Sequence, residues 1–309
     1  MKKRYGVVDI GTLKVKLQIV ETDSSKNLKT LYDSSTLTQL GSKRHNDIFP
    51  NPEFVQKTVD ELSRCKQVLQ EQQVDQVRVV STHALREMGE TGQQIAQTIK
   101  DKVGFKVEII SQEEEADLFF QAVIKDFKTD EDFTIMDQGG GSVQILIGNK
   151  KKLKHTFLLK TGSATLFDRF TPHHQGTDFP SRGEIRKMTN YVLEQLQPIP
   201  SSLKTPIIYG STCIIDIFQT LKLKLEPFSV SQSHPYKTPI KEVKDFLDKV
   251  WPIPYETREE IFHPKQRYYM WGIDKAFLNA VELAKKVQAP FVVPSNANIN
   301  QGLLQSLIS

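Results

Sequence analysis

A glycine-rich turn between two apolar runs constrains the fold of this chain more than any other stretch. The first run, 133–136, has the composition of a buried strand and ends on Asp137. Residues 139–141 are glycine, Ser142 follows, and the second run, 143–147, alternates like the return strand of a hairpin. Glycine adopts backbone conformations closed to other residues, and successive N–H groups in such a turn can form a concave anion site. The residues alone leave two interpretations open, a phosphate-binding turn and a glycine-rich hairpin without a ligand.

A similar pattern occurs near the N-terminus. The stretch 5–17 reads YGVVDIGTLKVKL, in which a strand ends on Asp9, Gly11 and Thr12 follow, and an apolar alternation returns. The repetition indicates a duplicated strand–Asp–turn–strand unit, with one copy in each half of the chain. Two such hairpins facing each other across a cleft would hold one phosphate chain between them.

Composition places the chain among soluble globular proteins. Its 309 residues suffice for two domains, and 38% hydrophobic with 25% charged residues is the balance of a folded chain. The net charge of +4 is too small to indicate nucleic-acid binding. Cys65 and Cys213 provide neither a disulfide framework nor a metal-binding spacing, which favours a cytoplasmic setting. Asp9 interrupts the first apolar run, so the N-terminal stretch is a poor signal peptide. No apolar run approaches the length of a membrane span.

Strands and helices alternate along most of the chain, which predicts an α/β fold. The polar stretch 125–132 predicts a boundary between a first domain, 1–125, and a second domain, 126–309. The second half repeats the order of the first and includes one long helix predicted over 266–287. The last helix, 298–307, is a candidate to pack back on the first domain.

The chain resembles the exopolyphosphatase / guanosine pentaphosphate phosphatase (Ppx/GppA) family of the actin, sugar-kinase and heat-shock-chaperone superfamily. The matching segments follow the family's order and are VVDIGTLKVKL (7–17), STHALRE (81–87), ISQEEEADL (110–118), MDQGGGSVQI (136–145), TGSATLFDRF (161–170), YGST (209–212) and PSNANINQGLL (294–304). The resemblance implies two ribonuclease-H-like, actin-like domains with an interdomain cleft, in the family's short form. It also implies hydrolysis of the terminal phosphate of polyphosphate or of a nucleotide polyphosphate, usually with Mg²⁺.

The resemblance assigns roles to individual residues. Glu114 matches the catalytic glutamate that orients or deprotonates the attacking water, and Asp137 matches the aspartate near the metal and the water. With Asp9, these two carboxylates are the predicted metal ligands. The predicted phosphate-binding residues are Asp9, Gly11, Thr12, Lys16, Arg86, Gly139, Gly140, Gly141, Ser142, Gly210, Ser211 and Thr212.

The chain departs from the family's pattern at several polar positions. Leu13 replaces an asparagine, and Lys16 replaces an arginine, which keeps the charge but not the bidentate fork. Gln144 replaces a glutamate, and because a neutral amide binds a metal ion more weakly than a carboxylate, the use of Mg²⁺ is in question. Thr165 and Glu90 replace an arginine and an asparagine.

Glu114 also has a structural interpretation. It follows Ser111 by three residues, which is the spacing of a capping box at the start of a helix. Acidic side chains in a first helical turn also complement the helix dipole. The neighbouring Glu113 and Glu115 are predicted to be capping or surface residues.

Two of the predicted phosphate-binding groups have structural alternatives as well. Arg86 would present its guanidinium to phosphate oxygens from the first turns of a helix, or would form a surface salt bridge with Glu87 or Glu90. Ser211 and Thr212 follow a strand end, where they would bind phosphate or simply cap the next helix.

Three functions remain open from the sequence. The first is a phosphoanhydride hydrolase acting on polyphosphate, or alternatively on guanosine pentaphosphate. The second is a module that binds polyphosphate or an alarmone with little or no turnover, which the changes at Leu13 and Gln144 favour. The third is a kinase of the same superfamily, for which the adenosine-site motif is at best half present at 209–212. No membrane or specific nucleic-acid partner is expected, and a homodimer is one option for assembly.

Overall fold

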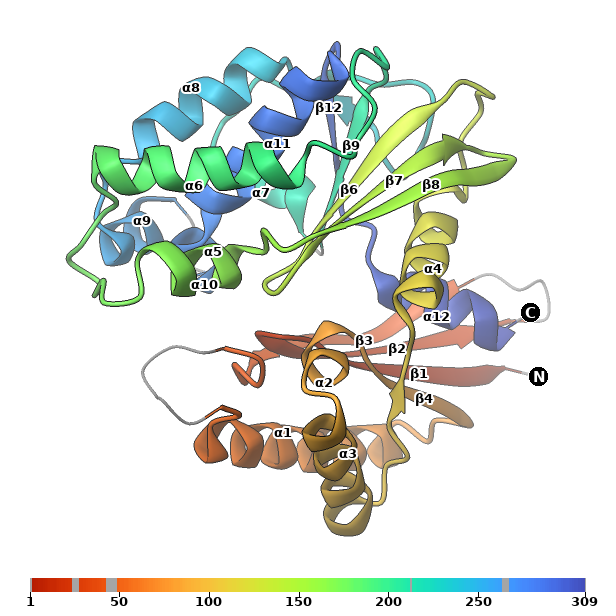
Figure 1. The fold of residues 1–309 in the computed structure, drawn as a ribbon. Coiled ribbons are helices and arrows are strands. Elements are labelled where there is room, and N and C mark those ends of the chain that lie inside the picture. Colours follow the sequence, from red (N-terminus) through yellow and green to blue (C-terminus); the bar gives the residue numbers. More distant parts are fainter. Residues whose placement is uncertain (1, 24–27, 43–48, 212, 263–266, 309) are drawn as a thin grey trace. The chain divides into compact units, whose positions relative to one another are not determined.

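The chain divides into two compact units that are described separately. The computed structural model describes residues 2–23, 28–42, 49–211, 213–262 and 267–308 (Figure 1). The first unit combines Met1–Ala122 with Ile299–Ser309, and the second unit is Val123–Asn298. Among the residues described, no helix combines the length and the apolar character needed to cross a membrane.

The first unit is built on a five-stranded sheet with the order β3-β2-β1-β4-β5. Its strands are β1 (Lys3–Ile10), β2 (Lys14–Thr22), β3 (Leu28–Leu37), β4 (Gln76–Ser81) and β5 (Glu108–Ile109). Strands β1, β2 and β3 pair antiparallel, whereas β4 runs parallel to β1 and β5 parallel to β4. Its helices are α1 (Pro52–Glu71), α2 (His83–Glu87), α3 (Glu90–Val103), α4 (Gln112–Ile124) and α12 (Ile299–Ile308).

Alternation along β1 and β2 directs apolar side chains to both faces of this sheet. Val8 and Leu17 lie on the face that packs against α1 and α3. Val7 and Val20 lie on the opposite face and pack against Leu303 of α12. Figure 1 shows α1 and α3 on one side of the sheet and α12 on the other. The C-terminal helix is therefore part of the first unit's core.

The second unit is built on a sheet with the order β12-β9-β6-β7-β8. Its strands are β6 (Phe133–Gln138), β7 (Val143–Asn149), β8 (Lys152–Leu159), β9 (Ile207–Gly210) and β12 (Val292–Ser295), with a separate two-stranded sheet of β10 (Glu226–Pro227) and β11 (Tyr236–Lys237). Its helices are α5 (Ser163–Phe170), α6 (Arg182–Gln195), α7 (Ile214–Thr220), α8 (Ile240–Val250), α9 (Tyr255–Phe262), α10 (Arg267–Trp271) and α11 (Ile273–Val287).

The two sheets share one topology. When the second sheet is followed from β8, three antiparallel strands are succeeded by two parallel ones, as in the first sheet followed from β3. The turn between β6 and β7 thus occupies the place of the turn between β1 and β2. This correspondence confirms the duplicated unit and the α/β fold class that the sequence predicts.

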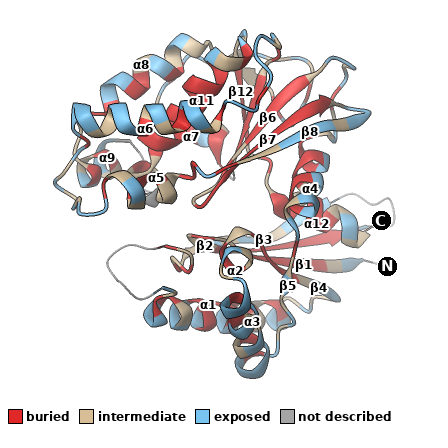
Figure 2. Ribbon diagram, viewed as in Figure 1, coloured by how far each residue is buried: buried red, intermediate tan, exposed pale blue. Residues whose placement is uncertain are grey.

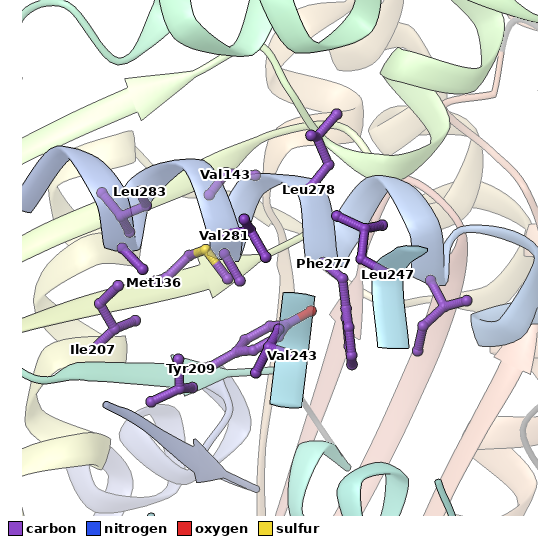
Figure 3. Close-up of a cluster of buried hydrophobic side chains, with 14 of the residues drawn as sticks. Met136, Val143, Ile207, Tyr209, Val243, Leu247, Phe277, Leu278, Val281 and Leu283 are labelled. Carbon is purple, nitrogen blue, oxygen red and sulfur yellow. The ribbon is translucent and has the colours of Figure 1, made fainter. Parts of the chain in front are cut away.

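Helix α11 forms the centre of the second unit, and nearly all its side chains are buried (Figure 2). Figure 3 shows its apolar residues against those of the sheet, including Phe277, Val281 and Leu283 beside Met136, Ile207 and Tyr209. The prediction of one helix over 266–287 is wrong, because the chain breaks at Gly272 between α10 and α11. Gly272 lies so close to α5 that an added Cβ would be 2.9 Å from Ser163 Cβ.

Candidate active site

Asp9 and Lys16 face each other across the first hairpin. They are directly paired between β1 and β2, and Lys16 Nζ lies 3.6 Å from Asp9 Oδ2. Asp9 is 4% exposed, and its Oδ1 atom has no hydrogen-bond partner among the described residues. Burial raises the pKa of Asp9, although the positive charge of Lys16 opposes this shift. One oxygen of this buried carboxylate is thus available to a water, a donor or a cation.

Backbone hydrogen bonds fix the turn beside Asp9. The Gly11 N–H donates to the Lys14 carbonyl over 2.9 Å, and the Gly41 N–H donates to the Thr12 carbonyl over 2.9 Å. Thr12 is buried against Gly41, where an added Cβ would lie 2.9 Å from Thr12 Cγ2. The predicted phosphate-binding residues Gly11 and Thr12 therefore lie in a well-defined turn next to Asp9, and their role stays a prediction.

Arg86 of α2 points toward the start of α4. Its Nη2 donates to Glu115 Oε2 over 2.8 Å, and its Nη1 donates to the Ile110 carbonyl over 3.0 Å. The salt-bridge partner of Arg86 is therefore Glu115, and neither Glu87 nor Glu90 takes that place. The arginine is held near the strand end where the sequence predicts phosphate binding.

The three adjacent glutamates of α4 have different surroundings. Glu114 Oε1 accepts a hydrogen bond from Arg78 Nη2 over 2.6 Å, and the Glu114 side chain is 43% exposed. Ser111 Oγ accepts from the Glu114 N–H over 3.0 Å, as expected for a cap. Glu115 is only 9% exposed, so the prediction that it is a surface residue is wrong.

Glu115 belongs to the group of charges around Asp9. Burial raises the pKa of Glu115, and the positive charge of Arg86 opposes that shift. The charges of Asp9 and Lys16 also act on Glu115. The first unit therefore brings together two buried carboxylates, Asp9 and Glu115, and two cations, Lys16 and Arg86. The catalytic role that the resemblance assigns to Glu114 stays a prediction.

The sequence contained a signal that distinguishes the two glutamates. The buried face of α4 carries Ala116, Phe119 and Phe120, and Glu115 lies one turn before Phe119 on that face. Glu114 falls outside this apolar stripe. Helical phase therefore identifies Glu115 as the carboxylate that points inward.

The glycine turn of the second hairpin is held from one side by α5. The Gly139 N–H donates to the Ser142 carbonyl over 2.9 Å and closes the turn. The N–H groups of Ser163 and Ala164 donate to the carbonyls of Gly139 and Gly140 over 3.2 and 2.9 Å, respectively. Thr165 Oγ1 donates to the Gly141 carbonyl over 2.7 Å. Thr165, which replaces the family's arginine, is therefore part of the support of the turn.

This arrangement orients the N–H groups of the turn. A trans peptide directs its C=O and its N–H to opposite sides, so the N–H groups of Gly140, Gly141 and Ser142 point away from α5. In the described part of the chain, these three N–H groups donate to no other backbone carbonyl. Three adjacent N–H groups on the same side form a binding site for an anion such as phosphate.

Asp137 and Gln144 are paired across the second hairpin, as Asp9 and Lys16 are across the first. Directly opposite residues of an antiparallel pair project their side chains to the same face. Gln144 is 3% exposed, and neither end of its amide has a hydrogen-bond partner among the described residues. A buried amide with both ends open is a group that a ligand could satisfy.

The strand end after β9 lies beside Asp137. Gly210 is the residue paired with Asp137 between the parallel strands β6 and β9. Ser211 follows it, and Thr212 lies outside the described residues. The Ile215 N–H at the start of α7 donates to Asn296 Oδ1 over 2.9 Å, so Asn296 contributes to the cap of that helix.

Each unit thus contributes one set of candidate groups. The first set is Asp9, Gly11, Thr12, Lys16, Arg86 and Glu115, and the second is Asp137, Gly139, Gly140, Gly141, Ser142, Gln144, Gly210 and Ser211. Among the described residues, no three His, Cys, Asp or Glu side chains are grouped closely enough to hold a metal ion. The predicted metal site of Asp9, Glu114 and Asp137 stays a prediction.

Comparisons with known proteins agree on the family. A model of the Ppx/GppA phosphatase family matches residues 18–268. The crystal structure of an exopolyphosphatase from Cytophaga hutchinsonii is 24% identical and covers 99% of this chain and 98% of that chain, with a TM-score of 0.84. The Aquifex aeolicus member of the Ppx/GppA family is 21% identical, covers 100% of this chain and 98% of that chain, and has a TM-score of 0.79. At these identities, the two structures establish the fold.

A curated relative is longer than this chain. The bifunctional 3-dehydroquinate synthase/phosphatase of Fusobacterium nucleatum is 22% identical over 249 residues, which make up 78% of this chain and 37% of that protein. This chain therefore spans well under half the length of that relative. The family match, in contrast, runs through most of the chain and both units, and it shows that this protein belongs to the Ppx/GppA phosphatase family.

Proposed function

We propose that this protein hydrolyses phosphoanhydride bonds and releases the terminal phosphate of inorganic polyphosphate, with guanosine pentaphosphate as the second candidate substrate. The observation that carries this proposal is the glycine turn, whose N–H groups at Gly140, Gly141 and Ser142 are directed away from α5. Such a turn binds phosphate oxygens and makes no contact that would select a nucleotide base. Membership in a phosphatase family and the fold shared with an exopolyphosphatase support the same conclusion.

Glu115 is the general base in this proposal, in place of Glu114. A general base works best when its pKa lies closer to the working pH than that of an exposed carboxylate. Burial raises the pKa of Glu115, while the Arg86 guanidinium favours the ionised form. Ionised Glu115 takes a proton from the water that attacks the terminal phosphorus, and the displaced phosphate chain leaves in line.

The cations and the turn stabilise the phosphoryl group as it transfers. Negative charge on the oxygens of that group is best stabilised by donors that are already fixed in place. Arg86 is fixed by its bonds to Glu115 and Ile110, and Lys16 by its contact with Asp9. The N–H groups of the glycine turn add neutral donors that bind the phosphate chain.

Asp137 and Gln144 are the residues that fit a magnesium ion. Mg²⁺ binds oxygen atoms and usually takes one or two carboxylates together with substrate phosphates. The unpartnered Oε1 of Gln144, on the same face as Asp137, is a buried oxygen that such an ion would satisfy. When bound, the ion would neutralise negative charge on the phosphate oxygens.

Phosphate release is the direct test of this function. Long-chain polyphosphate and guanosine pentaphosphate are incubated separately with the protein, with and without Mg²⁺, and free phosphate is measured. Release from polyphosphate supports the first substrate, and release from guanosine pentaphosphate alone supports the second. Binding of either compound without any release would contradict a hydrolase.

The absence of release would favour a second function, a polyphosphate- or alarmone-binding module. Gln144 is the observation behind this alternative, because its amide lies where the family has a carboxylate. A neutral side chain there keeps the ability to hydrogen-bond phosphate and gives up part of the metal-binding charge.

Arg86→Ala is expected to lower kcat/KM for polyphosphate at least about tenfold, because a charge-assisted bond is worth roughly 1.5–3 kcal/mol. The control is Arg78→Ala, which removes the arginine that pairs with Glu108 and Glu114 and should change kcat/KM little. Initial rates at low substrate concentration measure both variants. An unchanged kcat/KM in Arg86→Ala would show that this arginine does not bind the substrate.

Gln144→Glu is expected to raise the affinity for Mg²⁺, because it places a second carboxylate on the face of Asp137. Calorimetric titration of the protein with MgCl₂ measures this affinity directly, and the magnesium dependence of phosphate release provides a second measurement. Gln144→Leu is the control, since it changes the same side chain without adding a ligand. If Gln144→Glu alters neither the affinity nor the rate, position 144 has no part in metal binding.

A further inference from the structure

Asn279 places a buried amide in the middle of α11. The residue is 2% exposed, and its Nδ2 donates to the Thr161 carbonyl over 2.8 Å and to Gln138 Oε1 over 3.1 Å. A third acceptor, the Lys275 carbonyl one turn earlier, lies 3.1 Å from the same atom. Because two of these acceptors are backbone carbonyls, they determine which end of the amide is the nitrogen.

Both long-range partners of Asn279 flank the glycine turn. Gln138 is the last residue of β6, and its Nε2 donates to the Gly139 carbonyl over 2.9 Å. Thr161 precedes Gly162, which lies against the turn so closely that an added Cβ would be 2.3 Å from the Gly140 carbonyl oxygen. One side chain therefore holds both the strand that enters the turn and the segment that lies behind it.

Packing alone does not explain an amide at this position. Leu283, one turn later on α11, belongs to the apolar core, and Asn279 Oδ1 has no partner among the described residues. A buried polar atom without a partner lowers stability relative to an apolar side chain of similar shape. The turn, in contrast, is built of glycines, whose backbone is weakly constrained by its own sequence. Its N–H groups need support from elsewhere to converge on an anion.

We propose that Asn279 is a positioning residue for the phosphate chain. It acts through Gln138 and the Thr161 carbonyl, which together fix the glycine turn and so the direction of the Gly140 and Gly141 N–H groups. Asn279 does not touch the phosphate itself. This inference rests on the proposed function, because it assumes that the turn binds phosphate.

The test is the affinity of the full chain for inorganic tripolyphosphate, measured by calorimetry. Asn279→Leu is expected to bind about tenfold more weakly, the size of a small misplacement of binding groups. It should also melt earlier, because the Thr161 carbonyl and Gln138 Oε1 lose their donor. Gln138→Met, which keeps the length of the side chain, should reproduce the loss. The double variant should lose little more than either single variant, because both changes interrupt the same chain of contacts. With polyphosphate as substrate, KM should rise more than kcat falls.

Thr134→Val is the matched control. Thr134 lies on the same strand as Gln138, is fully buried, and shares a hydrogen bond of 2.7 Å with Thr205, but it lies at the far end of β6 from the turn. This variant should keep the parent's affinity. In NMR spectra without ligand, the Gly140 and Gly141 amide signals should shift in Asn279→Leu and stay in place in Thr134→Val.

An affinity in Asn279→Leu equal to that of the parent, or additive losses in the double variant, would overturn the proposal. If Asn279→Leu does not fold, Gln138→Met decides by the same affinity and amide signals. A parent protein that does not bind tripolyphosphate would instead overturn the proposed function, so the two failures are distinguished by the parent alone.

Discussion

Glu115→Gln is expected to lower the turnover of polyphosphate by at least about a hundredfold, since general-base assistance is typically worth about 10²–10⁴ in rate. Glutamine keeps the shape of the side chain and can still accept a hydrogen bond from Arg86, but it cannot take a proton from water. Substrate binding should therefore persist. Phosphate release under saturating substrate measures the turnover, and calorimetry with tripolyphosphate measures the binding.

Glu114→Gln is the matched control, with Glu113→Gln as a second one. Glu114 is partly exposed and pairs with Arg78, so its replacement should change turnover little and stability by no more than about 1 kcal/mol, the size of a surface pair. The opposite result, a loss of turnover in Glu114→Gln and none in Glu115→Gln, would restore the assignment made from the family resemblance. Equal, small effects in both would leave the hydrolase without a general base.

The pH dependence provides an independent check on Glu115. The side chain must be ionised to accept a proton, and burial raises the pKa of Glu115 above its ordinary value of 4.5, so turnover should already fall with decreasing pH above pH 4.5. Stability should show the reverse trend. The folded state holds this proton more tightly than the unfolded state. The contribution of protonated Glu115 to stability is therefore complete below pH 4.5 and is lost as pH rises through the folded-state pKa. Glu115→Gln should remove both effects.

The parts of the site that the sequence predicts are those determined by neighbouring residues. A strand, a glycine turn and a return strand are encoded within about fifteen residues, so both hairpins, with Asp9 and Asp137 at their strand ends, could be located before the structure was known. The pairing of Glu115 with Arg86 is harder to predict from neighbouring residues, because it depends on which face of α4 is turned toward the sheet.

Other features depend on contacts between residues distant in the sequence. Gly272, where the helix breaks, lies against α5, and nothing in the sequence around position 272 identifies Ser163 as its neighbour. The link from Asn279 to Gln138 joins residues 141 positions apart. A polar residue in a helix does not show by itself whether it faces solvent or a partner in the core.

The charged residues at the start of α11 also depend on contacts between distant residues, and they are expected to have a large effect on stability. Asp274, Lys275 and Arg258 of α9 are all fully buried. Asp274 Oδ2 lies 3.0 Å from Arg258 Nη1 and 3.1 Å from Lys275 Nζ. Lys275 and Arg258 also lie over the ring of Tyr255, at 4.9 and 4.5 Å from its centre. One buried anion therefore compensates two buried cations, and it joins α9 to α11.

Burial alone would raise the pKa of Asp274, but the charges of Arg258 and Lys275 outweigh burial and hold it below its usual range. Because the pKa is lower in the folded state, the contribution of Asp274 to stability is present above pH 3.8 and is lost as pH falls through the folded-state pKa. At neutral pH, replacement of this carboxylate should therefore lower the free energy of unfolding by its full contribution.

Asp274→Asn is expected to lower the free energy of unfolding by roughly 3–5 kcal/mol at neutral pH, because removing one partner leaves buried charge without compensation. Thermal and urea unfolding followed by circular dichroism measure this change. The matched control is Asp248→Asn on α8, which breaks an exposed pair with Lys244 and should cost less than about 1 kcal/mol. The difference between the variants should shrink as pH falls through the folded-state pKa of Asp274, which lies below 3.8. If Asp274→Asn is no less stable than Asp248→Asn, the buried charges are compensated without the carboxylate, and α9 and α11 are held together by the apolar contacts around Tyr255 alone.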